Sequence, residues 1–112
     1  MRKIIPVILL IFLTSCQSKL DTFAQCLTDQ GAIFYGSLSC EHCKEQKAFF
    51  EDSAEYLNYV ECDKYAKNSN YKACKEAKIN SYPTWIFSDG SYLIGKQSFP
   101  ELAEKTSCES PL

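Results

Sequence analysis

The stretch YGSLSCEHCKEQKAFF, residues 35–50, contains two cysteines, Cys40 and Cys43, with two residues between them. A short apolar run at residues 32–35 predicts a buried strand, and residues 40–51 predict a helix. Cys40 therefore stands at the expected start of the helix, where unpaired N–H groups and the helix dipole favour an anion. From these residues alone, the pair could be a redox centre, half of a metal site or a structural disulfide.

The position of the two sulfurs favours thiol chemistry. Cys40 would be the attacking thiolate, and Cys43, one turn further and more buried, would be the resolving thiol. His42 lies between them, and when protonated it would stabilise the Cys40 thiolate and make a disulfide here a stronger oxidant. The alternative for His42 is a solvated surface residue.

The remaining cysteines do not complete a metal or haem site. A zinc ribbon needs two C-x2-C pairs, but Cys62 and Cys74 have eleven residues between them. Covalent haem attachment needs a histidine directly after the second cysteine, where this chain has Lys44. A metal chaperone that binds through Cys40, Cys43 and His42 is a further alternative, but we expect no metal and no cofactor.

The first residues resemble an export signal. A basic start, Arg2 and Lys3, precedes an apolar run at residues 4–13 that is too short to span a bilayer. The following Leu13-Thr14-Ser15-Cys16 resembles the lipobox of bacterial lipoproteins. That resemblance implies a signal peptide at residues 1–15 and a lipid on Cys16 that anchors the chain to a membrane, followed by a tether at 16–21. The alternative is ordinary signal-peptide cleavage nearby.

Charge and export limit the partners. The chain has 12 basic and 14 acidic side chains, and loss of Arg2 and Lys3 would leave 10 and 14, a net charge of −4. No basic cluster exists, so nucleic acid is not an expected partner. An exported bacterial chain meets an oxidising compartment in which disulfides persist. Without Cys16, six cysteines remain, and 15 different sets of three disulfides are possible.

The pattern along the chain predicts a single domain at residues 22–108, with a tail at 109–112. We expect a capping box at 22–25, a first helix that stops at Gly31, and the order α-β-α-β-α-β-β-α. The later predicted elements are a strand at 57–62, a helix at 71–78, strands at 84–87 and 92–94, and a helix opened by a capping box at 98–101. The first two strands should be parallel.

A second motif, NSYPTWIF at residues 80–87, strengthens the fold assignment. With the C-x-x-C helix it resembles the thioredoxin-like fold, an α/β fold with a four-stranded mixed sheet flanked by helices. The resemblance implies a cis peptide bond before Pro83, facing the cysteines, with Tyr82 and Thr84 contacting substrate. The backbone of Tyr82 would pair with an extended segment as an added strand. The alternative is an ordinary trans-proline at the start of a strand.

Residues 23–108 also resemble the thioredoxin-like domain attached to bacterial and plant vitamin K epoxide reductase homologues. The resemblance is carried by FAQCLTDQGAIFYGSLSCEHCKEQKAFF, LNYVEC, ACKEAKINSYPTW and LAEKTSC. It implies that Cys40 and Cys43 are the active pair and that Cys62 and Cys74 form a disulfide. Cys26 and Cys108 are then left, either as a third disulfide or as two buried free thiols.

Three positions depart from these families. Ser39 replaces an aromatic residue before the first active cysteine, and Glu41 stands where proline is common. Thioredoxin has a buried acid at the place of Phe34, so proton transfer to Cys43 needs another route, through water or Glu41.

The function expected from these features is a lipid-anchored thiol–disulfide oxidoreductase in the bacterial cell envelope, on the periplasmic side. In Gram-negative bacteria it would lie at the outer membrane. It would oxidise exported cysteine-containing proteins and be recharged by a separate quinone-linked membrane oxidase resembling vitamin K epoxide reductase or DsbB. One alternative is a periplasmic reductase or isomerase. Another is a non-catalytic binding lipoprotein that keeps the fold and uses the 40–43 disulfide as a staple.

Overall fold

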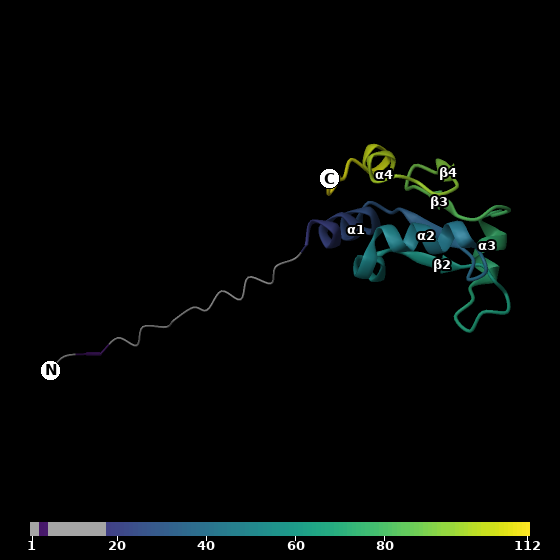
Figure 1. Ribbon diagram of the computed structural model, residues 1–112, viewed down its shortest axis with the longest axis horizontal. Helices are drawn as coiled ribbons and strands as arrows, with labels where there is room; N and C mark the ends of the chain where they lie inside the picture. Colours follow the sequence, from purple (N-terminus) through teal and green to yellow (C-terminus); the bar gives the residue numbers. More distant parts are fainter. Residues whose placement is uncertain (1–2, 5–17) are drawn as a thin grey trace.

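The computed structural model describes residues 3–4 and 18–112 of the chain (Figure 1). The elements, in order, are α1 (Lys19–Asp29), β1 (Ile33–Gly36), α2 (Glu41–Phe49), the 3₁₀ helix η1 (Glu51–Tyr56), β2 (Tyr59–Glu61), α3 (Tyr71–Glu76), β3 (Thr84–Ile86), β4 (Tyr92–Ile94) and α4 (Phe99–Thr106). Among these described helices, none is long and apolar enough to cross a membrane. Cys16, the predicted lipidation site, lies outside the described residues.

The four strands form one mixed sheet in the order β2-β1-β3-β4. β1 pairs with β2 in parallel, as predicted, and antiparallel with β3, which pairs antiparallel with β4. The registers place Phe34 beside Trp85, and Trp85 beside Leu93. This mixed sheet with flanking helices belongs to the α/β class and is compatible with a thioredoxin-like fold.

The two faces of the sheet carry separate apolar clusters, because side chains alternate along a strand. Phe34 points to the larger cluster, where its ring stacks on Trp85 at a centroid distance of 4.8 Å. Helices α1, α2 and α4 contribute to this cluster, which includes Phe23, Leu27, Cys43, Phe50 and Leu102. The next residue, Tyr35, points to the smaller cluster with the Cys62 and Cys74 sulfurs, where α3 packs.

The first helix begins earlier than the sequence predicted. Ser18 is its N-cap, and the Ser18 side chain accepts a hydrogen bond from the Asp21 N–H at 3.0 Å. The predicted capping box at 22–25 is wrong, because Thr22 lies within the helix and its hydroxyl donates to the Ser18 carbonyl. The added turn takes Leu20 to the edge of the main cluster, in line with Phe23 and Leu27.

Two other helices end sooner than predicted, each followed by a residue with positive φ. α2 stops at Phe49 rather than Glu51, and Glu51 has φ 50°. The 3₁₀ helix that follows was not predicted. α3 ends at Glu76 rather than Lys78, which has φ 58°. The capping box at 98–101 is confirmed, because Ser98 and Glu101 exchange hydrogen bonds at the start of α4.

Two disulfides link elements that are separate in the sequence. Cys62, after β2, bonds to Cys74 in α3, with 12 residues of sequence separation. Cys26 in α1 bonds to Cys108 after α4, with a separation of 82. The second bond joins the segment after α4 to the second half of α1, and the last residues of the chain lie near the start of that helix (Figure 1). Cys40 and Cys43 remain as free thiols.

Candidate active site

Cys40 is the N-cap of α2. Its Sγ accepts a hydrogen bond from the Cys43 N–H at 3.2 Å, in place of the side-chain oxygen that usually caps a helix. Because the sulfur meets the positive end of the helix dipole, this position suits a thiolate that attacks or leaves. Cys40 is partly exposed, so a disulfide on another protein can reach it.

Cys43 is 1% exposed and packs in the main apolar cluster. Burial raises the pKa of its thiol from 9.0 to about 12, and the neighbouring Cys40 adds to the rise. A backbone hydrogen bond at Ser37 and the charge of Lys47 act in the opposite direction on this pKa. Cys43 therefore stays protonated at neutral pH unless a neighbouring group takes its proton.

The loop between β1 and α2 is fixed by polar contacts. The Cys40 N–H donates to the Ser37 carbonyl at 3.0 Å, and the Ser37 and Ser39 hydroxyls lie 3.0 Å apart. The Leu38 N–H donates to Oε2 of the buried Glu61 at 3.0 Å. These contacts hold the segment before Cys40 against the end of β2.

His42 and Glu41 lie on the exposed side of α2. The His42 side chain is 69% exposed, and its Nδ1 lies 3.8 Å from Glu45 Oε2. Glu41 Oε2 lies 3.9 Å from Lys44 Nζ. Within the part of the chain that the structure describes, neither side chain forms a hydrogen bond with a cysteine sulfur. The structure thus brings the two cysteines together but directs these two side chains to solvent.

The Tyr82–Pro83 peptide bond is cis. Tyr82 packs against the cluster that contains both free thiols, and burial, followed by nearby charges that include Cys43, raises its pKa. Among the described residues, no backbone hydrogen bond engages the N–H or carbonyl of Tyr82. The Thr84 hydroxyl donates to the Ser81 carbonyl at 2.8 Å, which ties this turn together.

A buried amide that the sequence did not reveal connects α2 to the sheet. Gln46 is fully buried, and its Oε1 accepts hydrogen bonds from Trp85 Nε1 at 3.1 Å and from the Gln97 N–H at 2.7 Å. Its Nε2 donates to the Gln97 carbonyl at 3.1 Å. The available signal was helical spacing, because Gln46 follows Cys43 by three residues and precedes Phe50 by four.

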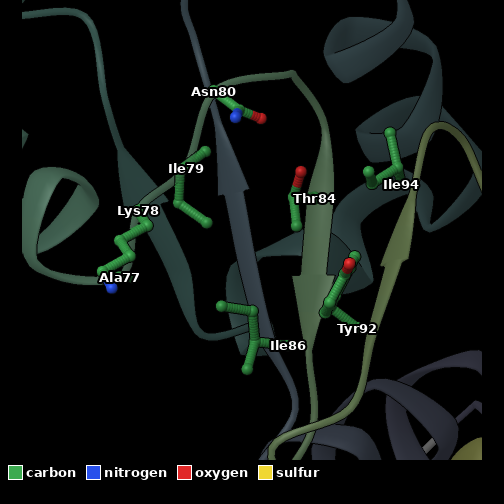
Figure 2. A pocket seen from close by; sticks show the side chains of 8 residues that line it. All are labelled: Ala77, Lys78, Ile79, Asn80, Thr84, Ile86, Tyr92 and Ile94. Atoms are coloured by element: carbon green, nitrogen blue, oxygen red, sulfur yellow. The ribbon is translucent and has the colours of Figure 1, made fainter.

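A separate apolar groove of about 340 Å³ lies on the sheet beside the Tyr82–Pro83 turn. Figure 2 shows its walls, with Thr84 and Ile86 on β3, Tyr92 and Ile94 on β4, and Ile79 facing them from the preceding segment. No cysteine lines this groove. In the described residues, no group of three or more His, Cys, Asp or Glu side chains could hold a metal ion.

The sequence is similar to that of a plant redox protein, the thiol-disulfide oxidoreductase LTO1 of Arabidopsis thaliana. The two are 46% identical over 87 residues, which make up 74% of this chain and 23% of the plant protein. No family model matches the chain. The chain thus corresponds to about a quarter of the length of the curated relative it matches.

Proposed function

We propose that this chain is a thiol–disulfide oxidoreductase that acts through Cys40 and Cys43. The observation that carries the proposal is the contrast between the two sulfurs. Cys40 is partly exposed at the N-terminus of α2, and Cys43 lies one turn further in, 1% exposed, with its N–H on the Cys40 sulfur. The name of the similar plant protein supports the same chemistry.

The reaction in the oxidising direction has two steps. A thiolate of the substrate attacks Cys40 Sγ of the oxidised pair, the Cys40–Cys43 bond breaks, and Cys43 leaves as a thiolate that takes up a proton. A second thiolate of the substrate then attacks the mixed disulfide. The substrate leaves with a disulfide, and the protein is left with two thiols, so two electrons pass from substrate to protein. The reducing direction is the reverse sequence.

The backbone of Tyr82 would hold the substrate beside Cys40. Its N–H and carbonyl have no backbone partner among the described residues, so an extended segment can pair with them. Thr84 would support this contact indirectly, because its hydroxyl bonds to Ser81 and fixes the turn. We assign Tyr82 to substrate binding and Thr84 to positioning.

We also propose a cellular setting for this activity, on the basis of the first sixteen residues. A basic start, an apolar run and a lipobox-like Leu13-Thr14-Ser15-Cys16 support export and a lipid anchor on Cys16, at the periplasmic side of a bacterial envelope. We propose exported cysteine-containing proteins as substrates and a separate quinone-linked membrane oxidase as the source of oxidising power. Two disulfides elsewhere in the chain agree with an oxidising compartment.

The test is a single-turnover transfer to a reduced, unfolded substrate such as ribonuclease A. The oxidised chain should form disulfides in the substrate, and Cys40→Ser should abolish the transfer. In the reverse direction, reduced Cys43→Ser mixed with unfolded ribonuclease A that carries disulfides should accumulate the mixed disulfide on Cys40, because the Cys43 thiol that would resolve it is absent. Transfer by the Cys40→Ser variant at the wild-type rate would refute the proposal.

The direction of electron flow is tested by the reduction potential of the 40–43 pair against glutathione. A reduction potential of about −120 mV supports the oxidising role, and a value of about −270 mV supports the role of a reductase. The envelope location has a separate test. Mass spectrometry of the chain isolated from membranes should find Cys16 acylated and at the N-terminus.

A further inference from the structure

A polar pair on β2, with one partly buried and one buried member, lies near the free thiols and has no part in the exchange steps above. Tyr59 and Glu61 are two residues apart on this strand, so their side chains share one face. The Tyr59 hydroxyl donates to Glu61 Oε1 at 3.1 Å, and Glu61 is 8% exposed. A carboxyl group buried to this extent is rarely found without a partner or a role.

Gly36 brings this pair within reach of Cys43. A Cβ on Gly36 would lie 3.2 Å from Cys43 Sγ, 3.2 Å from the Tyr59 hydroxyl oxygen and 2.8 Å from Tyr59 Cε2. The sulfur and the hydroxyl therefore border the same small space, which exists because residue 36 has no side chain. A single water molecule hydrogen-bonded to both atoms would complete a path between them.

Cys43 needs a proton acceptor in this place. Burial is the largest cause of the raised pKa of its thiol, and this cause persists when Cys40 is bonded to a substrate in a mixed disulfide. Phe34 on β1 is buried but apolar, and Glu41, with a side chain 77% exposed, pairs with Lys44 on the outer face of α2. The partly buried Tyr59 borders the same space as the Cys43 sulfur, and its hydroxyl is hydrogen-bonded to the buried Glu61.

We propose that Tyr59 and Glu61 are the proton route of Cys43, an inference that rests on the proposed oxidoreductase function. When Cys43 resolves a mixed disulfide, its proton passes to the Tyr59 oxygen while the Tyr59 proton passes to Glu61 Oε1. The Cys43 sulfur then bonds to Cys40 Sγ, and the bond from Cys40 to the substrate sulfur breaks. The substrate leaves as a thiolate. In the opposite direction the same groups return a proton to Cys43 as it leaves Cys40.

Tyr59 carries no charge at any point in this exchange, because it receives one proton as it gives up another. Burial, followed by the nearby Glu61, raises the pKa of Tyr59, which disfavours a free phenolate. A concerted transfer avoids that state. Glu61 has a narrow contact with solvent, through which the proton can reach bulk water.

The charged and titratable groups around the pair come from four segments. From α2, Lys47 Nζ lies 3.5 Å from the centre of the Tyr59 ring, and Cys40 adds its own thiol. The Leu38 and Asp63 N–H groups each donate to Glu61 Oε2 at 3.0 Å, and the Asp63 carboxylate accepts from the Tyr65 N–H at 2.9 Å. From the Pro83 turn, Tyr82 completes the surroundings, and both Cys43 and Glu61 influence its pKa. The backbone donors hold Glu61 in place, and its Oε1 faces the Tyr59 hydroxyl.

The test separates the two steps of oxidation by glutathione disulfide. The full chain, with Cys40 and Cys43 reduced and both other disulfides intact, reacts with glutathione disulfide at Cys40. Acid quenching and mass spectrometry then follow the release of glutathione as Cys43 resolves the bond. The rate constant of this second step is measured from about pH 5 to about pH 9 for the wild type and the variants Tyr59→Phe and Glu61→Gln.

The expected result is a fall of at least about tenfold in the second step at neutral pH for each variant, with recovery as hydroxide rises. The first step should stay unchanged, which shows that the site is folded. The second step of the double variant should be no slower than that of the slower single variant, because each single change already interrupts the same proton route. Tyr65→Phe and Glu76→Gln, which remove the same groups from exposed positions, should leave both steps unchanged.

Two results for the second step would overturn the inference. If Glu61 acted only as a negative charge near the sulfur, Glu61→Gln would favour the Cys43 thiolate and accelerate the second step. An unchanged second step with a normal pH profile in both variants would also overturn it. If the wild type itself failed to release glutathione, the oxidoreductase proposal would fail instead.

A measurement on the wild type covers the case in which a variant does not fold. In the proposed step two protons move together, from Cys43 to Tyr59 and from Tyr59 to Glu61. The rate of the second step should therefore depend on the deuterium fraction of the solvent along a curve. A linear dependence, or none, would count against the route.

Discussion

Replacement of Gln46 by leucine tests the buried connection between α2 and the sheet. Leucine fills a similar volume but cannot make the three hydrogen bonds of the amide. The change would leave the indole N–H of Trp85 and both backbone groups of Gln97 without partners in a buried region. Gln46→Leu should therefore destabilise the fold although it makes the core more apolar.

The size of the effect follows from the groups left unpaired. Each buried group without a partner costs about 1–3 kcal/mol, so three of them at the lower part of that range cost about 4–5 kcal/mol. Burial of the leucine side chain returns about 2 kcal/mol. We expect a net loss of about 2–3 kcal/mol in the free energy of unfolding, a large share of what a domain of this size has.

The assay is urea unfolding followed separately by Trp85 fluorescence and by far-UV circular dichroism, with both structural disulfides intact. The midpoint should fall while the slope stays unchanged, because the buried area is conserved. The matched control is Gln30→Leu at the exposed C-cap of α1, which should stay within about 0.5 kcal/mol of the wild type. A cost below about 1 kcal/mol for Gln46→Leu would refute the account of this network.

A double variant assigns part of the cost to the indole. Trp85→Phe removes the N–H that Gln46→Leu leaves unpaired, so the two changes together should cost less than the sum of the single changes, by about 1 kcal/mol. Unfolding of these variants is monitored by circular dichroism. If the losses in the free energy of unfolding simply add, the Trp85 hydrogen bond contributes little to stability.

Three further predictions concern a disulfide, a thiol and a helix cap. Replacing Cys62 and Cys74 together by serine should cost about 3 kcal/mol in urea unfolding, because the bond closes a loop of 12 residues, and a cost below about 1 kcal/mol would contradict this. Since folding raises the pKa of Cys43 from 9.0 to about 12, the folded state holds its proton longer than the unfolded state. The free energy of unfolding of the reduced chain should therefore fall between about pH 9 and about pH 12, by up to about 1.4 kcal/mol per pH unit, and Cys43→Ser should lose this slope. Ser98→Ala should cost about 1 kcal/mol by removing the acceptor for the Glu101 N–H, whereas Ser98→Asp should cost less than half of that.

Most of the predictions that rest on local signals are correct, although the capping box predicted at 22–25 is not. The C-x-x-C helix start, the Gly31 stop and the capping box at 98–101 depend on neighbouring residues, and the structure has each of them. Helix ends were predicted less well, because they depend on backbone conformations such as the positive φ of Glu51 and Lys78. Neither residue type announces that conformation in a sequence.

The polar contacts of the candidate site depend on long-range packing, which the sequence does not show. Gln46 forms a hydrogen bond with Gln97, which is 51 residues away in the sequence. The Leu38 N–H donates to Glu61, which is 23 residues away. Gln46 and Glu61 are both buried, although glutamine and glutamate are residue types that are usually exposed to solvent. The sequence also does not show the direction of the His42 side chain, which α2 turns to solvent, with its Nδ1 3.8 Å from Glu45 Oε2.

The three cysteine pairs differ in access, and this difference directs exchange to one sulfur. Cys62, Cys74 and Cys108 are 5% exposed or less, so each of the two disulfides has at least one sulfur closed to attack from solution. Thiol–disulfide exchange needs an in-line approach of a thiolate to sulfur, and its rate depends on that access. Cys40 is partly exposed at a helix N-terminus, where negative charge is favoured. A small domain can therefore use disulfides for stability and a dithiol for exchange at the same time, because burial keeps its own reactive sulfur away from the bonds that hold it together.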